Sequence, residues 1–209
     1  MLTYLSLNSL ALRGDVERAM NVFDIAKKSF SEKRVILTSL ASSLMEALSH
    51  NGWVDEATKF FEFMTNENYV SFDALRHYLQ VLEEAGQFET LNSVAFRQKY
   101  LDNQRLTPEE RRELIIWRIR ARCGLNDMDS ALNALNTLTS PVTNKDMAPP
   151  NHEAFAPIIE GFVRNNLTDR AEEIVKEAAK YGLDRNDVLF HNAYIAGFAK
   201  DYERAMAYV

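Results

Sequence analysis

The sequence predicts an all-α fold in which about six helical hairpins stack on one another as an α-solenoid. Three observations predict it: apolar residues recur with helical spacing, short polar turns interrupt that spacing, and the turns recur at nearly constant separation. The composition agrees, because the 209 residues include only seven Gly and five Pro, and 46% are hydrophobic. A single globular helical bundle is the alternative fold that the same pattern leaves open.

The stretch from His152 to Asp184 shows the repeating unit most clearly. Small residues at Ala156 and Gly161 leave room for a neighbouring helix, and Gly182 is typical of a helix C-terminus. Neither helix is long or apolar enough to be stable alone, so the pair is expected to stack on similar pairs. The apolar residues at i, i+3, i+4 and i+7 are Phe155, Ile158, Ile159 and Phe162 in the first helix and Ala171, Ile174, Val175 and Ala178 in the second.

A six-residue turn sequence joins the two helices and recurs along the chain. Its first residue is expected to adopt the left-handed conformation that ends the first helix. An acidic residue caps the second helix, and the last residue, usually alanine, lets the two helices cross closely. Successive copies begin 34 to 40 residues apart, close to the roughly 34 residues of a helical-hairpin repeat. The copies are GDVERA (14–19), GWVDEA (52–57), GQFETL (86–91), NDMDSA (126–131), NLTDRA (166–171) and KDYERA (200–205).

The elements between these turns follow in order. Residues 1–12 have helical apolar spacing and lack the basic start of a signal peptide, so they are interpreted as the remnant of a first helix. Leucine, phenylalanine and methionine stripes predict buried faces in the second and third hairpins. Thr107-Pro-Glu-Glu110 is an N-cap signature that begins a helix reaching Gly124. The next helix ends before Ser140, and three prolines exclude a helix from residues 141–150, which are interpreted as a spacer in preference to a partner-binding insertion.

The predicted organisation is one solenoid domain over residues 1–209. Its approximate hairpins are residues 1–37, 38–71, 72–107, 108–151, 152–187 and, incompletely, 188–209. The last of these stops within its second helix without the polar capping helix that usually ends a solenoid. The chain is therefore expected to be a piece of a longer array.

Composition and motifs argue against several classes of function. The formal net charge of −6 disfavours a surface that grips nucleic acid by charge alone. Phosphate-binding loops, nucleophile elbows and dinucleotide motifs are absent from the sequence, so no catalytic residue, cofactor or small-molecule substrate is predicted. The four histidines fall in different hairpins, which argues against a metal site, and the single Cys123 is expected to be a buried thiol. No run is long and apolar enough for a membrane span.

Two first helices and one second helix carry a family resemblance. Ala154 to Phe162 (AFAPIIEGF) and Phe190 to Phe198 (FHNAYIAGF) resemble the first helix of a pentatricopeptide repeat, and Asp55 to Met64 (DEATKFFEFM) resembles its second helix. The resemblance extends over the whole chain, is best in the second, fifth and sixth hairpins, and shades into tetratricopeptide-like repeats. It implies a right-handed α-solenoid that binds single-stranded RNA, one base per repeat.

The resemblance also implies which residues contact RNA. The fifth residue of each first helix and the last residue of each repeat read the base in this family. Only Ser42 and Asn192 are polar residues of the expected kind at the fifth position, whereas Arg76 and Ile116 depart from it and Ala156 cannot form a side-chain hydrogen bond. The fifth-position residues, aligned on the Gly or Ala near the middle of each helix, are Ser42, Arg76, Ile116, Ala156 and Asn192. Ser71 and Asn186 fall near the last position, with Asp187 one residue further on.

One turn further along the same predicted face, acidic and basic residues are mixed. These residues are Glu46, Gln80, Arg120, Glu160 and Ala196. Arginines are concentrated in the fourth hairpin, at positions 111, 112, 118, 120 and 122. They are interpreted equally well as contacts to phosphate or an acidic partner and as solubilising charges held in salt bridges.

Two functions follow from these observations. The first is an RNA-binding helical-repeat protein that acts in organellar gene expression, on transcript stability, processing or translation. The second is a non-catalytic protein-binding scaffold, such as a subunit of an organellar ribosome or expression complex, which the acidic charge favours. The resemblance alone implies a mitochondrial location, with a plastid as the alternative. An enzyme that uses the array as a substrate-binding arm would need a catalytic domain outside these residues.

Overall fold

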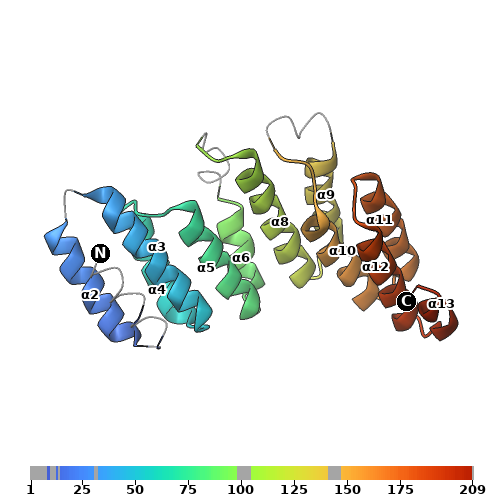
Figure 1. The fold of residues 1–209 in the computed structure, drawn as a ribbon, viewed down its shortest axis with the longest axis horizontal. Coiled ribbons are helices and arrows are strands. Elements are labelled where there is room, and N and C mark those ends of the chain that lie inside the picture. Colours follow the sequence, from blue (N-terminus) through green and yellow to red (C-terminus); the bar gives the residue numbers. More distant parts are fainter. Residues whose placement is uncertain are drawn as a thin grey trace. The chain divides into compact units, whose positions relative to one another are not determined.

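The computed structural model describes residues 9, 13, 15–30, 33–97, 105–140 and 147–208, and the helices are the regular elements of this part of the chain. Figure 1 shows that they follow one another as helical hairpins. The all-helical α-solenoid class predicted from the sequence is confirmed. The chain divides into two compact units, Met1–Gln87 and Phe88–Val209, each described separately below.

The first unit contains four helices: α2 (Val16–Ser29), α3 (Arg34–His50), α4 (Val54–Asn66) and α5 (Phe72–Glu84). Helix α3 is central, because it packs against each of the other three. Aromatic rings fill much of the core. Phe23 meets Phe60 edge to face with ring centroids 5.4 Å apart, and Phe61 stacks on Tyr78 at 4.2 Å. The Phe and Met stripe predicted on α4 is therefore a core face.

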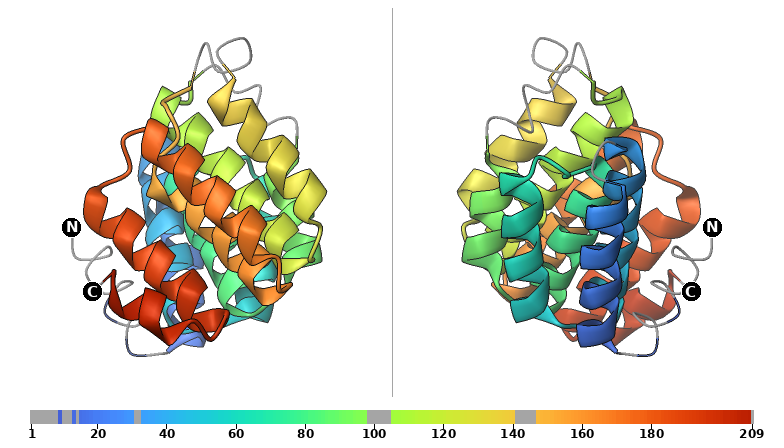
Figure 2. Two further views of the ribbon diagram at one scale, coloured as in Figure 1. Left: turned by 90° about the vertical axis from the view of Figure 1, so that its right-hand side faces the viewer. Right: turned by 90° about the vertical axis from the view of Figure 1, so that its left-hand side faces the viewer.

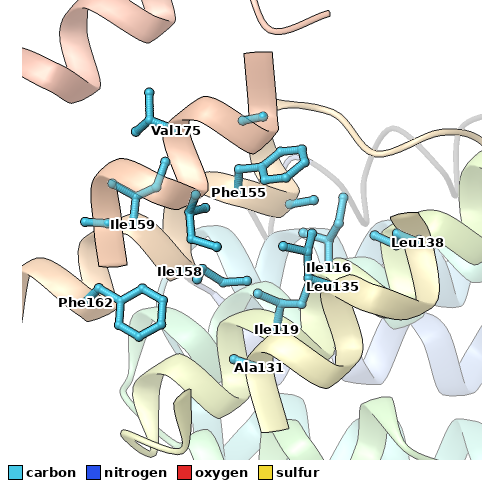
Figure 3. Close-up of a cluster of buried hydrophobic side chains, with 14 of the residues drawn as sticks. Ile116, Ile119, Ala131, Leu135, Leu138, Phe155, Ile158, Ile159, Phe162 and Val175 are labelled. Atoms are coloured by element: carbon cyan, nitrogen blue, oxygen red, sulfur yellow. The ribbon is translucent and has the colours of Figure 1, made fainter. Parts of the chain in front are cut away.

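The second unit contains α6 (Phe88–Ala95), α8 (Pro108–Gly124), α9 (Met128–Thr139), α10 (His152–Arg164), α11 (Thr168–Lys180), α12 (Arg185–Phe198) and α13 (Tyr202–Met206). Helix α8 packs on α6, α9 and α10, and α10 packs on α11 and α12. Figure 2 shows α12 and α13 lying against each other as the last hairpin. The apolar residues predicted between 155 and 178 form one buried cluster with α8 and α9 (Figure 3).

The turns between the helices have the predicted left-handed residue. The first residue of five turn sequences has a positive φ, between 58° and 69°, and Gly182 after α11 has φ 81°. The last residue of the six-residue turn sequence is fully buried in the first five copies. These residues are Ala19, Ala57, Leu91, Ala131 and Ala171. The left-handed residues are Gly52, Gly86, Asn126, Asn166 and Lys200; Gly14 lies outside the described residues.

Capping of the second helices differs in part from the prediction. Asp15, Asp127 and Asp201 accept a hydrogen bond from the backbone N–H three residues later, as expected for an acidic N-cap. In α4 and α11 the prediction is wrong, because Trp53 and Leu167 occupy the N-cap position and form no side-chain cap. The acidic residues of these two turns lie inside the first helical turn, where they interact with the helix dipole.

The other local predictions concern α8, the loop after α9 and the N-terminus. Thr107 and Glu110 form both hydrogen bonds of a capping box, 3.2 and 2.7 Å long, which confirms the signature before α8. Residues 147–151 are non-helical, as predicted, while residues 141–146 and nearly all of 1–12 lie outside the described part of the chain. Among the described helices, none has both the length and the apolar character that a membrane crossing requires.

Lys200 provides a direct test of the left-handed turn. It has φ 61°, a conformation that costs a residue with a Cβ about 1 kcal/mol more than glycine. Lys200→Gly is therefore expected to raise the free energy of unfolding by up to about 1 kcal/mol, measured by urea denaturation. Lys180→Gly is the matched control, because Lys180 is helical, and it is expected to lower stability.

Candidate nucleic-acid interface

Two of the predicted RNA-binding residues lie side by side in the first unit. The hydroxyl oxygens of Ser42, on α3, and Ser71, before α5, are 2.6 Å apart. Ser71 is the N-cap of α5 and accepts a hydrogen bond from the N–H of Ala74 at 3.1 Å. Both serines are partly exposed. The predicted fifth and last positions of the second hairpin therefore form one polar site.

The hydrogen bonds of this pair determine what it offers to a ligand. The Ser42 hydroxyl donates to the carbonyl of Thr38 at 2.9 Å, which uses its only proton. Ser71 then donates to Ser42, so both protons are engaged within the protein. Each oxygen keeps a lone pair, and the pair is therefore best suited to accept hydrogen bonds from a ligand's N–H groups.

The remaining predicted positions of the first unit are paired with their own helix. Arg76 forms an ion pair with Asp73 at 3.1 Å, and its guanidinium lies 5.2 Å from the centre of the Phe72 ring. One turn further, Gln80 donates to Glu84 at 2.9 Å, and both side chains are exposed. This part of α5 presents a hydrophilic surface with little net charge.

In the second unit, the fifth-position residues are less suited to contact a base. Ile116 is only 2% exposed and belongs to the buried cluster, so it is not available to a ligand. Ala156 is partly exposed, and one turn further Glu160 pairs with Arg164 at 3.1 Å. Arg120 is partly exposed, with its guanidinium 4.9 Å from the centre of the Trp117 ring.

The left-handed turn residues define the register of the first helices. Ser42, Arg76, Ile116 and Ala156 each lie ten residues before the left-handed residue that follows their helix, whereas Asn192 lies eight residues before Lys200. Two residues correspond to about 200° around a helix, so Asn192 is on a different face from the other four. Phe190 occupies the equivalent place on α12.

Burial supports this register. Ala196, predicted to lie on the same face as Glu160, is only 2% exposed, so that prediction is wrong. The residue equivalent to Glu160 in the turn-based register is Tyr194, which is exposed. Alignment on Gly197 produced the error, because the segment from this glycine to the turn is two residues shorter than the segment after Gly161. Counting back from the turn sequence would have found Phe190 and Tyr194.

The residues predicted near the last position of the fifth hairpin lie in the first turn of α12. Asn186 is exposed, whereas the carboxylate of Asp187 lies 3.7 Å from Nδ1 of His152 on α10. In the fifth hairpin, the counterpart of Ser42 is Ala156, whose side chain has no polar atom. The fifth hairpin therefore lacks the two-residue polar site of the second.

The arginines of α8 are used mainly inside the protein. Arg112 donates to the carbonyl of Pro149 at 3.1 Å, and Arg118 donates to the carbonyl of Ala95 at the end of α6 at 3.2 Å. Arg122 pairs with Asp127 at 2.9 Å. The guanidiniums of Arg118 and Arg122 also lie over the Phe96 ring. Most of these contacts are to backbone and rings, so the arginines connect helices and contribute less to an open basic surface.

Two histidines that fall in different hairpins of the sequence meet in the structure. The rings of His152 and His191 stack with centroids 5.1 Å apart, and Asp187 lies beside His152. Within the described residues this group does not form a site with three metal ligands, and His191 has no hydrogen-bond partner on either ring nitrogen. Burial, and next the neighbouring His152, hold the pKa of His191 below its usual value, while Asp187 acts in the opposite direction.

This lowered pKa predicts a loss of stability in acid. Because the unfolded chain binds a proton at His191 more readily than the folded chain, the free energy of unfolding is expected to fall as pH decreases through and below about 6.5. His191→Phe should reduce that fall, which can be measured by urea denaturation at several pH values. Equal slopes for His191→Phe and the original chain would contradict the prediction.

Cys123 is partly buried against the core of the second unit. Burial raises the pKa of its thiol to about 12, so the reactive thiolate is scarce at neutral pH. The structure therefore supports the packing role expected from the sequence.

Comparisons with known proteins agree with the geometry. Residues 40–69 match the family model of the PPR repeat, which covers α4 and most of α3. The structure is similar to the crystal structure of the pentatricopeptide repeat protein PPR10 from maize, with a TM-score of 0.50 and 20% sequence identity. The similarity covers 95% of this chain and 32% of the maize chain, so the chain spans about a third of that protein's structure. A search of curated proteins found no match.

Fold and sequence together define the class. The protein is a helical-repeat protein with the fold of an α-solenoid. More particularly, residues 40–69 match a pentatricopeptide repeat.

Proposed function

We propose that this chain binds single-stranded RNA through its first helices and acts in organellar gene expression, on transcript stability, processing or translation. The observation that carries the proposal is the Ser42 and Ser71 pair, whose oxygens are 2.6 Å apart. Ser42 lies in the matched repeat, and Ser71 lies two residues beyond its end. Two adjacent acceptors at the predicted base-reading positions suit a base edge that carries N–H donors. The same proposal places the protein in the mitochondrion, with a plastid as the alternative.

The binding test uses fluorescence anisotropy with pooled single-stranded RNA at low salt. Ser42→Ala combined with Ser71→Ala is expected to weaken binding about five- to tenfold, since each side chain contributes on the order of one hydrogen bond. Ser93→Ala, at an exposed serine of α6, is the matched control and should bind as the original chain does. No rise in the anisotropy of the RNA with the original chain at low salt would reject RNA binding.

A protein-binding scaffold is the second candidate function. The formal net charge of −6 and the internal contacts of Arg112, Arg118 and Arg122 favour it, because few of the clustered arginines remain for phosphate. If RNA is not retained, affinity purification of the full-length protein from organelles would be expected to yield a stable partner protein that binds the purified chain directly.

A further inference from the structure

Helix α12 carries a row of exposed aromatic side chains, here called the aromatic row: Phe190, Tyr194 and Phe198. Their exposed fractions are 65%, 36% and 46%. A spacing of four residues places them along one side of the helix, next to the buried residues His191 and Ile195. The Phe190 ring meets the His191 ring edge to face with centroids 5.5 Å apart. Large exposed rings in a regular row are unusual on a soluble surface and indicate a binding surface.

The aromatic row is not on the side of the first helix that packs against the first helix of the neighbouring hairpin. Helix α10 meets α12 through His152, whose ring stacks on His191. In the turn-based register, the residue of α12 equivalent to His152 is Asn186, which is not part of the row. The row is equivalent to Ala156, Glu160 and Arg164 on α10, which remain at least partly exposed although α12 packs on that helix. The aromatic row therefore lies on the same side of its helix as the solvent-exposed residues of α10.

The geometry of the aromatic row suits nucleobases. Residues four apart on a helix are separated by about 6 Å along its axis, close to twice the 3.4 Å rise of stacked bases. Arg185 and Lys200 are exposed at the two ends of α12, where they can approach phosphates. Two neighbouring carboxylates are engaged elsewhere: Asp187 faces His152 at 3.7 Å, and Asp201 accepts the N–H of Arg204 at 3.1 Å.

We propose that the aromatic row is a stacking platform for the bases of single-stranded RNA, and that it binds without selecting a sequence. This proposal rests on the RNA-binding function proposed above. It differs from base reading by hydrogen bonds, because rings stack on the face that every base presents. The sixth hairpin thus contributes affinity for RNA of any sequence, whereas the Ser42 and Ser71 pair of the second hairpin forms hydrogen bonds with a base.

The test compares the full chain with the combined variant Phe190→Ala, Tyr194→Ala and Phe198→Ala. Binding of fluorescein-labelled oligoadenylate and oligouridylate is measured by anisotropy over a series of salt concentrations. The variant is expected to bind each at least about tenfold more weakly, with an unchanged slope of log K against log salt, because stacking is lost while phosphate contacts remain. The combined variant with Phe, Tyr and Phe replaced by Trp should retain the original affinity.

Tyr202→Ala is the matched control, since Tyr202 is 67% exposed on α13 and lies outside the row. It should bind both probes like the original chain, and circular dichroism should show unchanged helicity for every variant. If the original chain binds RNA and the combined alanine variant binds equally well, the stacking platform is rejected while the RNA-binding function stands. If the original chain binds neither these probes nor pooled RNA, both proposals are rejected.

Discussion

Phe155→Ala is expected to lower the free energy of unfolding of the second unit by about 3–5 kcal/mol. The Phe155 ring is fully buried in the cluster formed by α8, α9, α10 and α11 (Figure 3). Its removal loses apolar contact and leaves a cavity, which rigid helices on several sides cannot close. The loss is large compared with the total free energy of unfolding of a domain of this size, which is only about 5–15 kcal/mol.

Phe198→Ala is the matched control for this measurement. Phe198 is on the exposed side of α12, so truncating it is expected to change stability by less than about 0.5 kcal/mol. Urea denaturation followed by circular dichroism measures both variants. A loss below about 1 kcal/mol for Phe155→Ala would mean that this cluster does not hold the second unit together.

Gly124→Ala is expected to destabilise the packing of α8 on α6 by about 1–3 kcal/mol. A Cβ at Gly124 would lie 2.3 to 2.5 Å from three ring carbons of Phe88, the first residue of α6. Such contacts are far too short, so either the ring or the helix must move. The loss is expected to exceed the roughly 1 kcal/mol that alanine gains over glycine in a helix.

Gly197→Ala isolates the helix contribution from the steric one. Gly197 lies in the last turn of α12, and a Cβ there would have no neighbour within 4 Å. It is therefore expected to raise stability by up to about 1 kcal/mol in the same denaturation experiment. If Gly124→Ala and Gly197→Ala both stabilise the protein, the Phe88 ring can move aside with little loss of packing energy.

The sequence was sufficient to predict the hairpins because their turns are specified locally. Gly52 and Asn166 have residue types that favour positive φ, and fixed apolar spacings precede and follow them. The predicted site on α12 was misplaced for a different reason. The central glycine of a first helix is not at a fixed distance from the turn, because Gly197 lies three residues before Lys200 whereas Gly161 lies five residues before Asn166.

Contacts between hairpins were less accessible to sequence reasoning. Arg112 and Arg118 donate to the backbone carbonyls of Pro149 and Ala95. Because every residue has a backbone carbonyl, the sequence does not indicate which one accepts the hydrogen bond. The stacking of His152 on His191 depends on how far α12 rotates against α10, which residue spacing alone does not specify. The sequence predicted Ser42 and Ser71 as two separate RNA-contacting residues, and the direct hydrogen bond between them is seen only in the structure.

Hydrogen bonds that link neighbouring hairpins have a consequence for how the chain folds. Asn165 donates to Asn126 across 39 residues, and Tyr181 donates to the carbonyl of Thr139 across 42. Each bond closes a loop of only about one repeat, for which the entropy of closure is modest. Low contact order of this kind favours rapid folding, with nucleation in any adjacent pair of hairpins and growth along the array.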